Sequence, residues 1–427
     1  MAAPLSFDQA PPISVPYRFF LTAPLFQMLA GALLLVEGDA LLASRWTPGA
    51  LALTHLFTVG FMLQAMLGAL MQFIPVVAGG NLWRPRLIAG VAHPLLTLAA
   101  LLLATAFLSG APLAFRLAGG LFALAAGVLL PAIGMALARR LPPTPTLQAL
   151  RLSTSGLAVT VLLGLWLLHS LHSGSAWPLP LLTDIHLGWG LGVWGLGLLA
   201  GASYVVVPMF QLTPPYPKAL SRLLLPGLLL AAVLGSLPLL PPLLPHDLSA
   251  ATPQLALLAG IGQFLALALA AVFAGSTLIL QGRRRRRVAD PGLLFFRLGM
   301  LALLSAIAAC LASQPVLAGA LLAGLFLSVI SGMLYRIIPF LNCLHLQTTL
   351  RPGTPPPTVG QMLEESAMRR HLWLHLAACL SLAAAAAGLP LTRLAGVLLL
   401  LAGGLLWRNL GLAVLRYQRR KQALPSA

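Results

Sequence analysis

The stretch Thr54-His55-Leu56-Phe57-Thr58-Val59-Gly60, which runs on to Gly68-Ala69-Leu70-Met71-Gln72-Phe73-Ile74-Pro75, decides the fold of this chain. It is apolar over a length that can cross a membrane. It carries a histidine near one end, and a Gly-x6-Pro signature closes the other end. Because hydrocarbon contains no water, every backbone amide must bond within its own segment, which favours a helix. The stretch therefore predicts a membrane-spanning helix with one polar side chain near its end.

The same signature occurs twice more along the chain. Gly201 to Pro208 ends a second long apolar run, which carries His186 near its start, and Gly332 to Pro339 ends a third. We therefore interpret the chain as three versions of one four-helix membrane unit, of which two keep a histidine. The pseudo-repeats are expected at about residues 17–138, 152–280 and 292–406.

The composition indicates a membrane protein. Of the 427 residues, 59% are hydrophobic and only 8% are charged, which excludes an ordinary water-soluble domain. Apolar runs of membrane-spanning length recur along the chain, and the alternating pattern of a membrane barrel is absent. We expect an all-α polytopic protein with about 12 transmembrane helices in a single domain covering residues 1–427. The predicted spans are Tyr17–Ala43, Gly49–Val77, Leu87–Leu108, Pro112–Ala138, Leu152–Leu171, Leu181–Phe210, Ala219–Leu244, Gln254–Leu280, Gly292–Leu311, Val316–Leu341, His371–Leu389 and Thr392–Leu406.

The net charge of +18 does not indicate a nucleic-acid partner, because the basic residues fall in short loops between apolar runs. The run Arg283 to Arg287 fits a cytoplasmic topology anchor better. Loops after the even-numbered spans and both termini hold nearly all of the 26 lysines and arginines, whereas the opposite side holds only Arg45, Arg116 and Arg393. This asymmetry predicts that both termini are cytoplasmic. We expect the protein to lie in a bacterial inner membrane, with the lipid bilayer as its main partner.

The segments outside the spans carry few further signals. The three cysteines lie in or beside apolar runs, so no disulfide framework is implied. The first sixteen residues lack the layout of a cleavable signal, so we expect the first span to remain in the mature protein. The longest connection, residues 342–370, is expected to be a cytoplasmic loop with a short surface helix from Val359 to Met368.

The histidines near the outer face are the main functional candidates. His55 and His186 lie in the outer halves of the second and sixth spans, and His169 and His172 lie at the outer end of the fifth. Ionisable groups at membrane depth are costly, and neutral imidazole is the usual protein ligand of haem iron and copper. We expect one haem or metal held by His55 with His186, or with His169 or His172. Two alternatives remain: each of His55 and His186 bonds a neighbouring helix's carbonyl or hydroxyl, or they serve proton or ion conduction.

The spacing of these histidines adds a constraint. His55 lies 13 residues before Gly68, whereas His186 lies 15 residues before Gly201. At ~100° per residue, this offset turns the two rings to different helix faces. Pairing them therefore requires a bulge or a different register in one span.

The architecture resembles the catalytic subunit I of the haem–copper oxidases, including the cbb-type and nitric oxide reductase branches. In this resemblance, His55 matches the second-span histidine that ligates a low-spin haem, and His186 matches the sixth-span histidine that binds the active-site copper. The phrases Val207-Pro208-Met209-Phe210 and Ile338-Pro339-Phe340-Leu341 are similar to a smaller branch, the NnrS-type haem- and copper-containing membrane proteins. The resemblance implies haem b or copper as cofactor, and respiratory-chain or copper-handling proteins as partners.

The chain departs from this family at its other ligand positions. In the oxidases the seventh span supplies a histidine pair to copper and the tenth supplies two haem histidines, whereas Ala219–Leu244 and Val316–Leu341 contain none. We therefore expect a redox, nitric-oxide-related or metal-handling role without oxidase turnover. The rival functions are a transporter or permease built from internal repeats, and a non-catalytic assembly partner of a respiratory complex.

A second group of candidate ligands lies on the cytoplasmic side. Cys343 and His345 follow the third signature, and His371 and His375 are four residues apart on one helix face. Cys-x-His with His-x3-His would suit zinc or copper(I), and the alternative is that these are ordinary histidines at the membrane interface. Arg336, inside the tenth span, is expected to extend towards the headgroups.

Overall fold

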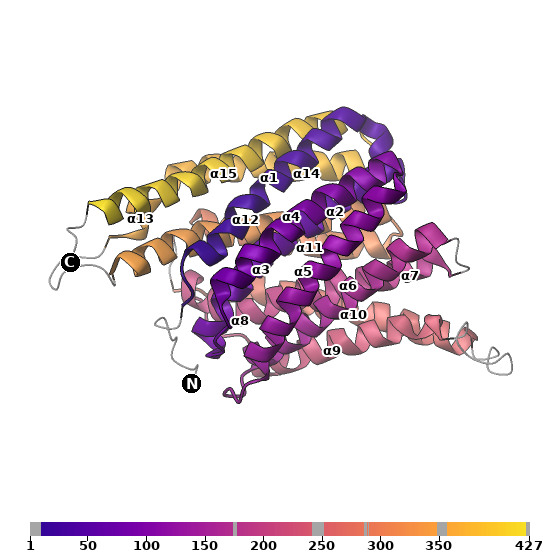
Figure 1. Ribbon diagram of the computed structural model, residues 1–427, viewed down its shortest axis with the longest axis horizontal. Helices are drawn as coiled ribbons and strands as arrows, with labels where there is room; N and C mark the ends of the chain where they lie inside the picture. The colour runs from indigo at the N-terminus through magenta and orange to yellow at the C-terminus, as the bar shows by residue number, and fades with distance from the viewer. Residues whose placement is uncertain are drawn as a thin grey trace. The chain divides into compact units, whose positions relative to one another are not determined.

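The protein is a set of long helices (Figure 1). The computed structural model describes residues 10–173, 177–240, 252–285, 288, 290–347 and 357–423, and these residues form no strand. Among them, eleven helical segments are long and apolar enough to cross a membrane. The expected all-α polytopic fold is therefore confirmed, whereas the threefold repeat stays a prediction.

The chain forms two compact units. The first unit includes Phe73–Leu95 and Ala111–Arg286, and the second consists of Pro11–Gln72, Leu96–Gly110 and Arg287–Ala427. The segment predicted as the first pseudo-repeat thus contributes to both units. We describe each unit by itself.

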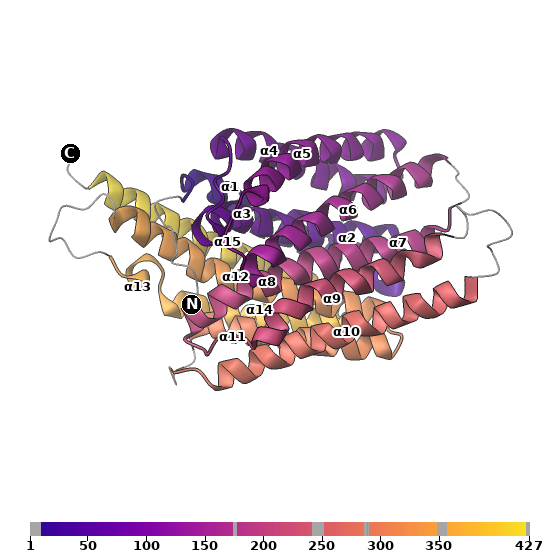
Figure 2. The same cartoon turned by 90° about the horizontal axis from the view of Figure 1, so that it is seen from below.

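The first unit contains six α-helices and shorter π and 3-10 segments within its described residues. α9 and α10 lie side by side in it (Figure 2). The elements are the π-helix η4 (Ile74–Ala78), α5 (Pro112–Ala138), α6 (Pro145–Ser173), α7 (Leu179–Leu187), the π-helix η5 (Gly188–Leu196), α8 (Gly197–Gln211), α9 (Lys218–Ser236), the 3-10 turn η6 (Leu237–Leu239) and α10 (Thr252–Gly282).

The second unit joins the beginning of the chain to its end. Its first and last long helices, α1 and α15, lie side by side (Figure 1). The elements are α1 (Ser14–Glu37), the 3-10 helix η2 (Gly38–Ala43), α2 (Pro48–His55), the π-helix η3 (Leu56–Leu63), α3 (Gln64–Phe73), α11 (Pro291–Leu311), α12 (Pro315–Gln347), α13 (Val359–Met362), α14 (Glu365–Ala386) and α15 (Thr392–Gln422). α4 (Pro85–Ser109) begins in the first unit and ends in the second.

A helix is present at each of the twelve predicted spans, and the bounds of α5 agree with those predicted for the fourth span. The predicted span His371–Leu389 corresponds to α14, which is not among the eleven apolar segments. Two arginines and two histidines lie in the first half of α14 and lower the hydropathy of this helix. The predicted end of the seventh span at Leu244 lies outside the described residues.

The connection predicted at residues 342–370 is shorter in the structure. α12 continues past the third signature to Gln347, so residues 342–347 are helical. Hydrogen bonds hold this extension: Tyr17 Oη donates to Asn342 Oδ1 (2.6 Å), and Asn342 Nδ2 donates to the Ala413 carbonyl oxygen (2.9 Å). α12 is thereby tied to α1 and α15 in the buried interior.

The surface helix predicted from Val359 to Met368 is interrupted. α13 ends at Met362, and Leu363 adopts an extended backbone before α14 begins. The break allows the Leu363 side chain to be buried. Residues 348–356 of the predicted loop lie outside the described part of the chain.

α1 and α15 approach each other closely because glycines face each other. A Cβ added at Gly31 would lie 2.6 Å from the backbone nitrogen of Leu400, and one at Gly396 would lie 2.7 Å from the Gly31 carbonyl oxygen. Lipid is as apolar as leucine, so membrane helices associate through such close packing rather than through a hydrophobic driving force. Gly31 and Gly396 therefore set the spacing of these two helices.

We expect Gly396→Val to push α1 and α15 apart and to lower the free energy of unfolding by about 1–3 kcal/mol, as overpacking does. Thermal unfolding in detergent measures the effect. The control is Gly411→Val on the same helix, where an added Cβ meets nothing within 4 Å. Equal losses in both variants would mean that helix propensity, and not the close approach, limits stability.

Candidate functional site

His55 is the last residue of α2, and the π-helix η3 begins at the next residue. Its Nδ1 lies 2.8 Å from the carbonyl oxygen of Leu51, and its ring packs on Phe107 with the centroids 5.1 Å apart. A carbonyl oxygen only accepts, so Nδ1 carries the hydrogen and Nε2 of the neutral ring keeps its lone pair. Nε2 makes no hydrogen bond with any residue that the structure describes.

His186, in the first unit, also bonds a backbone carbonyl oxygen through Nδ1. It lies near the end of α7, and the π-helix η5 begins at Gly188. Its Nδ1 lies 3.1 Å from the carbonyl oxygen of Thr160 on α6, so here too Nδ1 carries the hydrogen. A Cβ added at Gly164 would lie 3.1 Å from the imidazole, so this glycine makes room for the ring.

The π-helices follow the histidines in both spans. η3 starts directly after His55, and η5 starts two residues after His186. α12, which contains the third predicted span Val316–Leu341 and has no histidine within that span, is α-helical throughout. A π-helix bonds residue i to i+5 and so changes the register of the side chains that follow. It is rare and occurs frequently at functional sites. A π-helix is therefore present beside the histidine in both spans, whereas the predicted pairing needs a change of register in one span, so the pairing of His55 with His186 stays a prediction.

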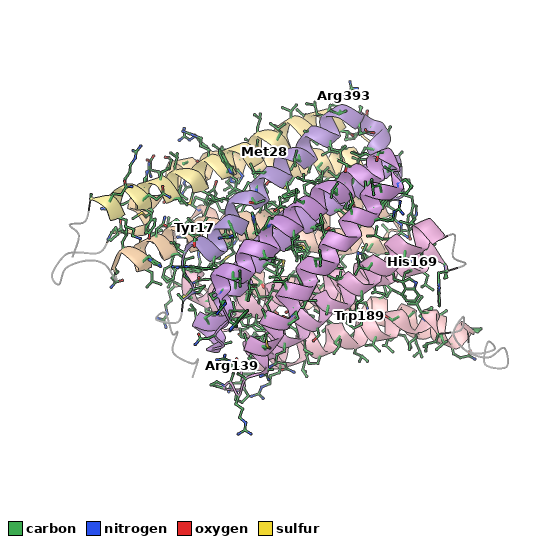
Figure 3. The ribbon with its side chains drawn as sticks, in the orientation of Figure 1. Tyr17, Met28, Arg139, His169, Trp189 and Arg393 are labelled. Carbon is green, nitrogen blue, oxygen red and sulfur yellow. The ribbon has the colours of Figure 1, made fainter. Side chains whose placement is uncertain are left out.

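The other predicted ligands of this group lie on α6. His169 is exposed near the end of that helix (Figure 3). His172 is also in α6, but its side chain lies outside the described residues. His55 belongs to the second unit and His186 to the first, so each ring is described in its own unit.

His371 and His375 lie together on α14, and both are fully buried. Their ring centroids are 5.6 Å apart. Asn409 Nδ2 on α15 donates to Tyr335 Oη (2.9 Å) and to the Ala367 carbonyl oxygen (3.3 Å). Tyr335 on α12 therefore accepts from Asn409, and its hydroxyl also shares a hydrogen bond with His371 Nδ1 (2.8 Å).

The second ring of this pair is bonded in a similar way. His375 Nε2 lies 2.9 Å from Ser328 Oγ and 3.4 Å from Cys379 Sγ. The remaining nitrogens, His371 Nε2 and His375 Nδ1, are buried and have no hydrogen-bond partner among the described residues. Buried polar atoms without partners are rare, and each calls for a physical explanation.

Cys343 and His345 lie in a different cluster. Cys343 packs with Leu346, Met362 and Tyr417, and the His345 ring meets Tyr417 edge-on at a centroid distance of 6.3 Å. Within the described ranges, no group of three or more His, Cys, Asp or Glu side chains is placed to hold a metal ion. The structure thus brings His371 to His375, but it does not add Cys343 and His345 to them.

Arg336 does not simply extend towards the headgroups as expected. It forms an ion pair with Asp290, which also caps α11 by accepting a hydrogen bond from the backbone N–H of Leu293 (3.1 Å). The paired carboxylate offsets the cost of a charge on a membrane helix. Nothing in the local sequence pattern links Asp290 to the tenth span, so this ion pair could not be predicted from the sequence.

A comparison with known protein families and with curated proteins finds no match for this chain.

We expect Tyr335→Phe to lower stability by about 1–3 kcal/mol, because it leaves His371 Nδ1 and a hydrogen of Asn409 without a partner. Thermal unfolding measures the loss. Tyr204→Phe is the matched control, since the Tyr204 hydroxyl is buried and has no partner among the described residues, so its removal should be neutral or stabilising. Unchanged stability of Tyr335→Phe would contradict the hydrogen bonds of this cluster.

Proposed function

We propose that the protein is a multi-pass inner-membrane protein in which His55 and His186 bind haem b or copper through Nε2. Its role would be in redox chemistry, in nitric oxide metabolism or in metal handling, without oxidase turnover. The distribution of basic residues supports cytoplasmic termini. The resemblance to haem–copper oxidase subunit I is part of the same proposal.

The observation that carries the proposal is the shared tautomer. In both rings Nδ1–H donates to a backbone carbonyl, which orients the imidazole and leaves Nε2 as the atom with a lone pair. Histidines that bind metals almost always donate their other ring N–H in this way, and the bond raises the basicity of the ligand nitrogen. The alternative that the sequence left open, a bond to a neighbouring helix's carbonyl or hydroxyl, describes His186 but not His55, whose partner Leu51 lies on the same helix. Either bond is compatible with a ligand role.

Haem fits these residues better than a copper ion held by protein alone. Haem iron needs only one or two axial side chains, whereas the described residues offer no group of three ligands. A bound haem or copper would supply one-electron redox chemistry. The chain's own residues would orient the ligand nitrogens, and Phe107 would pack against the His55 ring and restrict its rotation.

The test is an absorption spectrum and an elemental analysis of detergent-purified protein from haem- and copper-replete cells. We expect a bound chromophore or metal, with affinity lowered by more than about a hundredfold in His55→Ala or His186→Ala, because removal of a ligand costs more than a change in the groups that orient it. Gly164→Val should also lower occupancy, because it keeps the imidazole but fills the space beside it. The control is His93→Ala, which removes a histidine on α4 that belongs to neither group of predicted ligands. A colourless, metal-free wild-type protein would end the proposal.

A second candidate function, a proton-linked transporter or permease, is favoured by the buried His371–His375 pair. Four helices, α11, α12, α14 and α15, enclose this pair in the second unit, and Phe295 packs on both rings at centroid distances of 5.1 and 5.2 Å. Ionisable groups inside membrane helices often mark proton relays. The unpartnered His371 Nε2 and His375 Nδ1 are the atoms through which a proton would pass.

Proteoliposomes that contain a pH-sensitive dye test this second candidate under an imposed membrane potential. We expect proton uptake by the wild-type protein and its loss in His371→Gln and His375→Gln. His169→Gln, which changes an exposed histidine, should retain uptake. Uptake that survives both substitutions on α14 would exclude the pair as the pathway.

A further inference from the structure

An apolar groove lies on the surface of the second unit, where α1, α14 and α15 meet. α1 contributes Met28, which Figure 3 labels, and α14 contributes Leu374. α15 contributes Leu401, Gly404 and Leu405. A Cβ added at Gly404 would touch only the end of the Met28 side chain, at 3.9 Å, so this glycine keeps the groove open.

Arg408 is the one charged residue that lines the groove. Its side chain is exposed and makes no hydrogen bond or ion pair with the part of the chain that the structure describes. Two other arginines nearby are paired: Arg369 with Glu365 and Arg416 with Glu364. The groove therefore combines apolar walls with a single uncompensated positive charge.

The level of Arg408 along the helices matches a membrane interface. The neighbouring Asn409 bonds the Ala367 carbonyl oxygen in the first turn of α14, where the exposed ion pair of Glu365 and Arg369 also lies. Trp407 beside it is 47% exposed, and tryptophan is enriched at headgroup level. From Arg408 the groove follows α15 for about 12 Å, at 1.5 Å per residue, to Leu400.

We propose that this groove binds one acidic phospholipid, with its phosphate on Arg408 and one acyl chain along Leu405, Leu401 and Leu400. A guanidinium matches the geometry of phosphate oxygens and binds them bidentately. The apolar walls offer nothing to the polar remainder of a soluble phosphate ligand, whereas they fit an alkyl chain. One uncompensated positive charge favours a headgroup of net negative charge over a zwitterionic one.

The experiment reconstitutes the full chain in vesicles of equal phosphatidylglycerol and phosphatidylcholine and counts the lipids retained after detergent extraction by native mass spectrometry. We expect the wild-type protein to retain more phosphatidylglycerol than phosphatidylcholine. Arg408→Gln should reduce that preference about tenfold, the effect of a charge-assisted hydrogen bond, and Arg408→Lys should largely keep it. Gly404→Leu should reduce retention of both lipids, because the side chain fills the groove.

Two controls make the outcome decisive. Arg140→Gln removes an exposed arginine of the first unit, and Gly411→Leu adds a side chain where there is open space; both should behave as wild type. Equal lipid selectivity in Arg408→Gln and wild type would overturn the proposal. Binding of inorganic phosphate to lipid-free protein in an Arg408-dependent way would also overturn it, by showing a site for a soluble anion.

Discussion

A backbone N–H inside hydrocarbon has no water to bond to, and this constraint shapes every span of the protein. The regular helices satisfy it with bonds from residue i to i+4. The chain departs from this pattern at the 3-10 segments η2 and η6 and at three π-helices, η4, η3 and η5. In η3 and η5 the bonds of the π-helix run from residue i to i+5 instead. His55 and His186 adjoin these departures, so the place where the helix changes register is also the place where an imidazole is held by a backbone carbonyl.

Buried hydrogen bonds and close glycine contacts join the helices of the second unit. Gly31 and Gly396 allow α1 and α15 to touch, and Tyr17, Asn342 and the Ala413 carbonyl link α1, α12 and α15. Such bonds are specific in direction, whereas the apolar surfaces around them are interchangeable with lipid. Specificity in this unit therefore comes from a few buried polar atoms, among them those of the His371 cluster.

The positions of the helices could be predicted from the sequence because hydropathy over a membrane-length window is a local property. The spans and the i,i+4 pairing of His371 with His375 needed nothing more. The partners of these residues could not be predicted, because Tyr335, Ser328 and Asn409 come from other helices and the sequence does not state which helices are neighbours. The tautomer of His186 and the ion pair of Arg336 with Asp290 could not be predicted for the same reason, because Thr160 lies on α6 and Asp290 at the start of α11. The haem or copper ligands and the family resemblance stay predictions.

The polarity of α14 has a consequence for the biosynthesis of the protein. Its two histidines are hydrogen-bonded to Tyr335 and Ser328 of α12, and Asn409 of α15 donates to Tyr335 and to the Ala367 carbonyl oxygen of α14. These partners are synthesised at different times, because α12 precedes α14 in the chain and α15 follows it. The set of buried hydrogen bonds around α14 is therefore complete only after α15 has been translated, and a chain that terminates before α15 would lack the donor Asn409.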